Sequence, residues 1–181
     1  MGIVEILTFG PDYNTGLGIA TAIIGVAAFV CYLYEIYKHY GWLQSISISY
    51  YNDREIFQMF MYLSAFCVLC IGQNVMYGLV ALCFSVMAMF PSVLYKHFII
   101  PHCIFATTAI VLGLIGLPIC FDTFTGVCLD LIAVFGIGAL LYSKYKIKDP
   151  FISGTLLYWI EVESLSIIII GLLFNIIDII C

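Results

Sequence analysis

The chain has 181 residues, of which 64% are hydrophobic and 9% charged, with a mean hydropathy of +1.15 and a formal net charge of −5. Since a soluble domain has about a quarter charged residues, this composition leaves too few polar residues to cover a soluble core. The sequence has no basic patch of the kind that nucleic-acid-binding proteins carry, so nucleic acid is not an expected partner. The composition favours a protein whose apolar surface faces a lipid bilayer.

Six apolar stretches follow one another along the chain. Each has about 19–23 residues, enough at ~1.5 Å per residue to cross a hydrocarbon core of ~30 Å. We therefore expect an all-α fold, an integral membrane bundle of six transmembrane helices in one domain covering 1–181. The expected spans are about 17–37, 55–73, 75–95, 98–119, 125–143 and 155–177.

The segment before the first span is apolar but differs from a cleavable signal peptide. It lacks a basic region at its start and carries Glu5. We expect residues 1–9 to lie in the outer membrane interface as an amphipathic segment, followed by a loop at Pro11 and Asn14.

The connections between the spans differ in length and chemistry. The only long one, 38–54, is rich in Ser and Tyr and contains the sole arginine of the chain. A tight turn at 72–74 predicts that spans two and three form a helical hairpin. Prolines lie near the predicted helix ends, where a missing N–H costs little. These prolines are Pro91, Pro101, Pro118 and Pro150.

The basic residues all fall in alternate connections of the six-span arrangement. They are Lys38, Arg54, Lys96, Lys144, Lys146 and Lys148. Because Lys and Arg favour the cytoplasmic side, we expect these connections inside and both termini on the non-cytoplasmic side. No targeting motif names the membrane, and both viral and host membranes remain open.

Cysteine and glycine spacing carries weaker information. Cys67 and Cys70 form a C-x-x-C within an apolar helix, which indicates packing residues because no second pair or polar turn completes a zinc ribbon. A disulfide between Cys120 and Cys128, across the outer hairpin, is feasible, and inert thiols are the alternative. Small residues at helix-packing spacing, including Gly113 with Gly116, indicate a compact bundle, with a homo-oligomer or another membrane protein as the second interpretation.

An unpaired charge inside a span costs several kcal/mol, and three carboxylates stand out for this reason. They are Asp130, Glu161 and Glu163. Glu161 and Glu163 point in nearly opposite directions around a helix, so only one is expected to face the bundle. His102 could share a metal with Glu163 and Asp130, but Asp130 lies nearer the outer face. We therefore predict no metal and no cofactor, and expect His102 to be hydrogen-bonded to another helix.

The polar residues near the inner ends of the spans are predicted to form one cluster. Arginine can reach from an interface to a buried acid, so we expect Arg54 to contact Glu161 or Glu163. The expected members of the cluster are Ser49, Tyr50, Tyr51, Arg54, His102, Glu161 and Glu163.

Part of this pattern resembles a set of small bacterial and viral multi-pass membrane proteins of unassigned activity. The matching residues are Ser47-Ile48-Ser49-Tyr50-Tyr51, Arg54 with Phe57, Phe90-Pro91, His102, and Trp159 with Glu161. That set is distantly similar to the superfamily of alkaline ceramidases and progestin-and-adipoQ receptors, which are seven-span zinc amidases. This chain has six expected spans and three histidines, so the zinc residues do not carry over, and the resemblance does not imply hydrolase activity here.

Three functions remain open. Sparse ionisable residues favour a non-catalytic role as a scaffold, sensor or assembly component whose constant partner is the bilayer. The alternative is a membrane-embedded, metal-dependent lipid hydrolase using His102, a carboxylate of the last span and a serine from 45–49. A small transporter or channel ranks third, because no matching pair of mid-span helix breaks is present.

Overall fold

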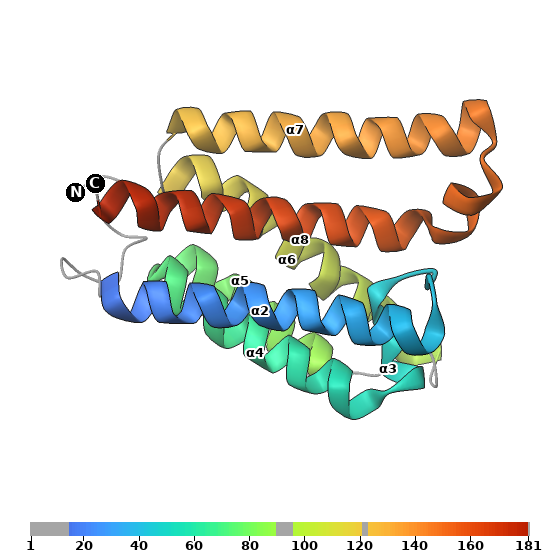
Figure 1. Ribbon diagram of the computed structural model, residues 1–181, viewed down its shortest axis with the longest axis horizontal. Helices are drawn as coiled ribbons and strands as arrows, with labels where there is room; N and C mark the ends of the chain where they lie inside the picture. The colour runs from blue at the N-terminus through green and yellow to red at the C-terminus, as the bar shows by residue number, and fades with distance from the viewer. Residues whose placement is uncertain (1–14, 90–95, 121–122, 181) are drawn as a thin grey trace.

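The computed structural model describes residues 15–89, 96–120 and 123–180, and the described part is helical with no strand. The long helices lie side by side along one axis, with short helical pieces at one end (Figure 1). The elements are α2 (Thr15–Tyr40), η1 (Ile46–Ile48), α3 (Ser49–Asn52), α4 (Arg54–Gly72), α5 (Val75–Met89), α6 (Lys96–Cys120), α7 (Thr123–Tyr142), the π-helix η2 (Ser143–Ile147) and α8 (Pro150–Ile180). The predicted all-α bundle is confirmed.

Five of these helices are long and apolar enough to cross a membrane. The remaining apolar helix, α5, has 15 residues and is shorter than the predicted third span. The predicted end of that span near 95 lies outside the described residues, as do the predicted interfacial segment at 1–9 and Pro91. The structure therefore supports a bundle with at least five helices of spanning length in its described part.

The turn between α4 and α5 forms as the sequence predicted. Gln73 adopts a left-handed conformation with φ 45°, and its N–H donates to Leu69 O at 3.0 Å. Asn74 then begins α5, since its Oδ1 accepts from the Tyr77 N–H at 2.9 Å while its side-chain amide donates to Gly72 O at 2.9 Å. These bonds satisfy backbone groups at both helix ends, which makes the two helices an antiparallel hairpin.

The prolines of α6 lie within the helix as the structure defines it, and not at its boundaries. Pro101 is in the second turn and Pro118 in the last turn of α6, whereas Pro150 is the first residue of α8, as expected. Pro101 is the sixth residue of α6 and lies beyond the first four N–H groups, which have no helical partner, so it removes one hydrogen bond of the helix.

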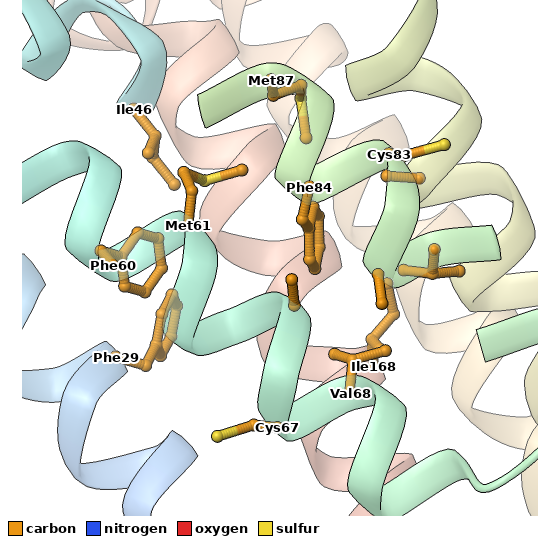
Figure 2. Close-up of a cluster of buried hydrophobic side chains, with 14 of the residues drawn as sticks. Phe29, Ile46, Phe60, Met61, Cys67, Val68, Cys83, Phe84, Met87 and Ile168 are labelled. Carbon is orange, nitrogen blue, oxygen red and sulfur yellow. The ribbon is translucent and has the colours of Figure 1, made fainter. Parts of the chain in front are cut away.

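The core lies between α2, α4, α5 and α8 (Figure 2). Aromatic rings fill it, with Tyr32 stacked on Phe60 at a centroid distance of 4.0 Å. Cys67 is a buried free thiol against Gly25, as expected for a packing residue. The outward faces remain apolar, for example at Phe124 (78% exposed) and Phe135 (74% exposed) on α7. Such faces are suited to a lipid environment.

Candidate functional site

Residues 41–53 fold over one end of the bundle; we call them the end segment. Helix α2 stops at Gly41, whose φ is 69° and whose N–H donates to Tyr37 O at 2.8 Å. Glycine adopts this left-handed conformation without the steric cost of a side chain. The segment ends at Asp53, whose Oδ1 accepts from the Ile56 N–H at 3.1 Å and so caps α4.

Two hydrogen bonds join the end segment to α8. The Ile46 N–H donates to Glu161 Oε2 at 2.5 Å, and the Tyr158 N–H donates to Gln44 O at 3.0 Å. The Glu161 side chain therefore faces the bundle end, and its partner is a backbone amide. A buried carboxyl with a hydrogen-bond donor costs far less than one without.

A third connection runs to α2. Ser49 is fully buried, and its hydroxyl donates to Ile46 O at 2.6 Å. Because that proton is used, the Tyr32 hydroxyl donates to Ser49 Oγ. Tyr32 was not among the predicted members of the cluster, because the sequence does not show which residue a single tyrosine in an apolar span contacts.

The fourth connection runs to α6. His102 is 5% exposed, and its Nε2 lies 2.7 Å from Ser47 Oγ. The roles of donor and acceptor in this bond follow the imidazole tautomer. His102 is thus hydrogen-bonded to another element, as expected, although its partner comes from the end segment and not from a helix of the bundle.

An apolar cavity of about 50 Å³ lies directly under the end segment. Its polar lining comes from Ser47, Glu161 and Ser64, and aromatic and aliphatic side chains supply the rest. The apolar lining residues are Ile46, Phe57, Phe60, Met61, Phe84, Met87, Ala106, Ile110 and Leu165. A second cavity of about 40 Å³ shares Phe60, Ser64, Phe84 and Leu165 with it and extends along the bundle.

The prediction that Arg54 pairs with Glu161 or Glu163 is wrong. Among the described residues no ion pair joins Arg54 to Glu161 or Glu163. Arg54 is exposed, and its guanidinium carbon lies 5.7 Å from the centre of the Tyr50 ring. Its position at the first residue of α4, directly after the capping Asp53, explains why it lies on the outside.

The other predicted members of the cluster divide into two groups. Tyr50 is buried and packs edge-on against Tyr51 and Phe57, with centroid distances of 5.5 and 5.6 Å. Glu163 lies away from the end segment, with its carboxyl group against Gly136 of α7. The structure therefore brings Ser49, His102 and Glu161 together at one end of the bundle. Glu163 and Arg54 lie apart from these three residues.

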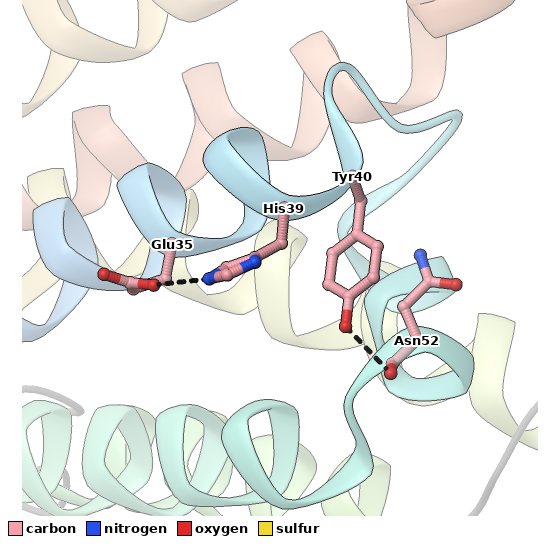
Figure 3. Close-up of polar contacts among 4 residues, drawn as sticks. All are labelled: Glu35, His39, Tyr40 and Asn52. Carbon is pink, nitrogen blue, oxygen red and sulfur yellow. Dashed lines mark hydrogen bonds and ion pairs between the residues drawn. The ribbon is translucent and has the colours of Figure 1, made fainter.

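A separate set of polar contacts lies at the surface of the bundle, at the same end (Figure 3). His39 Nε2 is 3.2 Å from Glu35 Oε2 one helical turn earlier. The Tyr40 hydroxyl donates to Asn52 O at 3.0 Å and ties α2 to α3. These residues are exposed or half-buried, so their contacts secure the end segment at the surface.

The conceivable three-residue metal site does not form. Within the described part of the chain, no three His, Cys, Asp or Glu side chains are close enough to hold one metal ion. Asp130 lies on α7 with a buried Oδ1 that has no hydrogen-bond partner. Cys128 has a free thiol, so the structure does not show the disulfide with Cys120, whose side chain lies outside those described.

Comparison with known proteins adds no relative. No protein-family model matches the chain, and no curated protein or solved structure is significantly similar to it.

Proposed function

We propose that this chain is a six-span integral membrane protein with both termini on the non-cytoplasmic side. The start of α2 and the end of α8 lie at the same end of the bundle, as an even number of crossings requires (Figure 1). The elements that carry Lys38, Arg54 and the η2 lysines meet at the opposite end. Lys and Arg favour the cytoplasmic side, so the end segment faces the cytoplasm. Helix α5, the third crossing in chain order, brings the number of crossings to six and is the shortest of them.

Within that membrane domain the chain acts as a non-catalytic sensor, scaffold or assembly component. The observation that carries this proposal is the end segment, which hydrogen-bonds to α2, α6 and α8 at once. A change in the arrangement of those helices would break bonds in the segment and alter the surface it presents to the cytoplasm. This is the property that a sensor or assembly component needs.

Cysteine labelling tests the topology. The native cysteines are replaced, and single cysteines are introduced at Lys146 in η2 and at Ser153 in α8, both near the proposed cytoplasmic face. An impermeant thiol reagent should label both sites only after the cytoplasmic side is exposed. Labelling of Lys146→Cys only from the outer face would overturn the orientation. The non-catalytic role predicts no lipid turnover by the purified protein.

A membrane-embedded lipid hydrolase is the second candidate, and one observation favours it. Ser47 Oγ lies 2.7 Å from His102 Nε2, and both Ser47 and Glu161 line the same cavity. Zinc content and fatty-acid release from mixed phospholipid vesicles separate the two functions. Stoichiometric zinc that disappears in His102→Ala, together with fatty-acid release, would establish the metal-dependent hydrolase in place of the sensor.

A further inference from the structure

The contact between Ser47 and His102 has the geometry of a nucleophile and its base. The 2.7 Å separation of Oγ and Nε2 is within the ~2.6–3.2 Å range that proton transfer between such groups requires. His102 is 5% exposed, so bulk water does not compete freely for its ring. A neutral imidazole that accepts from a serine hydroxyl raises the nucleophilicity of that oxygen.

Ser47 is also placed where a substrate could reach it. It lines the cavity of about 50 Å³, which exceeds the ~30 Å³ share of one water molecule in the liquid. The walls beyond Ser47 are apolar, with Phe60, Met61 and Leu165 among them, and the second cavity continues past Phe60 and Leu165. No Lys or Arg among the described residues lines either cavity. This lining fits an uncharged acyl group better than a carboxylate or phosphate.

The residue before Ser47 is held by two hydrogen bonds. The N–H of Ile46 donates to Glu161 Oε2 at 2.5 Å, and the C=O of Ile46 accepts from Ser49 Oγ at 2.6 Å. Glu161 is therefore a positioning residue, since it fixes the residue that precedes Ser47. A fixed backbone matters because small displacements of a nucleophile from its productive position slow its reaction strongly.

From these observations we infer that Ser47 is an acyl-accepting nucleophile with His102 as its general base, and that its substrate is an uncharged carboxylic ester. Ser47 Oγ forms a bond to the carbonyl carbon, and its proton passes to His102 Nε2. The bond from that carbon to the alcohol oxygen then breaks, and the alcohol leaves with the proton from His102. The product is an acyl ester of Ser47 with the acyl chain in the cavity.

This inference rests on the membrane-embedded fold proposed above, and it holds for the sensor and for a hydrolase that uses no metal; zinc bound to His102 Nε2 would exclude it, because a metal-bound nitrogen cannot accept the proton of Ser47. If the acyl ester persists, the chain is a sensor that responds to an acyl donor by covalent modification. If water cleaves the ester and regenerates Ser47, the chain is a hydrolase.

The first experiment uses an alkyl fluorophosphonate on the purified full-length protein in detergent. Attack by Ser47 displaces fluoride and leaves one phosphonyl group, which intact mass and peptide mapping detect. We expect one adduct on Ser47, none in Ser47→Ala, and at least a ~100-fold slower reaction in His102→Gln. Glutamine can still hydrogen-bond to Ser47 but is not a base, so a merely structural contact would leave the rate unchanged.

Three further variants serve as controls. Ser166→Ala removes a hydroxyl that bonds within α8 to Val162 O, and it should label like the wild type. Glu161→Gln can still accept from the Ile46 N–H and should keep most of the rate, whereas Glu161→Leu should lose it. No adduct on Ser47, or an equal rate in His102→Gln, in proteins with unchanged melting temperatures would overturn the inference.

A second experiment separates this inference from the proposed function. Release of nitrophenol from 4-nitrophenyl butyrate is followed against protein concentration. One equivalent released in a burst supports acylation of Ser47 and leaves the non-catalytic sensor standing. Continuous release that disappears in Ser47→Ala supports acylation but replaces the sensor with the hydrolase. Absence of both a burst and continuous release contradicts acylation by esters and does not affect the topology.

Discussion

The two ends of the bundle are held together by different kinds of contact. At the end-segment side, hydrogen bonds connect residues far apart in the chain, such as Ser47 with His102 and Ile46 with Glu161. Toward the other end, glycines meet large side chains or backbone, as Gly171 meets Leu117 and Gly126 meets Pro118. One end therefore depends on the direction of polar groups, and the other on close approach of helices.

This difference predicts opposite sensitivities to substitution. In an apolar medium, helices associate through van der Waals packing of small residues and through interhelical hydrogen bonds. Adding one carbon should destabilise the protein most at the end where the glycines pack closely. Removing one hydrogen-bond acceptor should destabilise it most at the end-segment side. Four sets of substitutions test the contrast, in order of decreasing effect on the free energy of unfolding.

The largest effect is expected from Gly126→Ala. A Cβ at Gly126 would lie 2.5 Å from Pro118 N and 2.6 Å from Pro118 Cα, and these are backbone atoms of α6 that cannot rotate away. Separating α6 and α7 to admit the methyl group should cost about 3 kcal/mol. Denaturant unfolding in detergent micelles measures this loss.

Gly138→Ala is the matched control on the same helix. Nothing lies within 4 Å of a Cβ at Gly138, so alanine should stabilise the protein by about 0.5–1 kcal/mol through its higher helix propensity. Equal responses of the two glycines would show that close approach of α6 and α7 does not hold this end together.

Glu161→Leu is expected to have the next largest effect. Leucine fills a similar volume but leaves the Ile46 N–H without its acceptor, which should cost about 2 kcal/mol. Glu161→Gln retains an acceptor oxygen and should recover most of that loss. Glu163→Gln is the position control, because Glu163 does not contact the end segment. Thermal unfolding followed by intrinsic fluorescence would show the difference, and an equal loss in Glu161→Leu and Glu161→Gln would argue against the Ile46 contact.

The helices could be predicted from the sequence because hydrophobic length is a local property. The turn at Gln73 and Asn74 could be predicted for the same reason, since its partners lie within four residues. The end segment could not, because the partners that order it lie 12 to 115 residues away, from Tyr40 to Glu161. Hydropathy carries no information about such pairs.

The error at Arg54 has a specific physical cause. The prediction assumed that a buried carboxylate needs a cation, and it chose the sole arginine of the chain. In the structure the Ile46 amide serves as the donor to Glu161, and backbone N–H groups are invisible to an argument from side-chain charge. Ser47 was foreseen only as one of the serines at 45–49, because nothing local distinguishes the serine that meets His102.

Asn74→Ala should cost about 1 kcal/mol, typical of losing a side chain that caps a helix. The substitution removes the acceptor of the Tyr77 N–H and the donor to Gly72 O, each at 2.9 Å. Asn74→Asp keeps the acceptor alone and should lose less. Hydrogen exchange of the Tyr77 amide provides a local measure, and unchanged protection in Asn74→Ala would show that the cap does not hold the hairpin.

The smallest effect is expected from Arg54→Ala, and it distinguishes the observed bundle end from one closed by a buried ion pair. A buried Arg–Glu pair that loses one partner typically costs ~3–5 kcal/mol. Arg54 is instead exposed beside the Tyr50 ring, at 5.7 Å from its guanidinium carbon to the ring centre. Its removal should change the free energy of unfolding by no more than about 0.5 kcal/mol. The control substitution Lys148→Ala should have an equally small effect. A loss several times larger in Arg54→Ala than in Lys148→Ala would mean that Arg54 pairs with a carboxylate in the folded protein, and Glu161→Gln would then destabilise the protein by a similar amount.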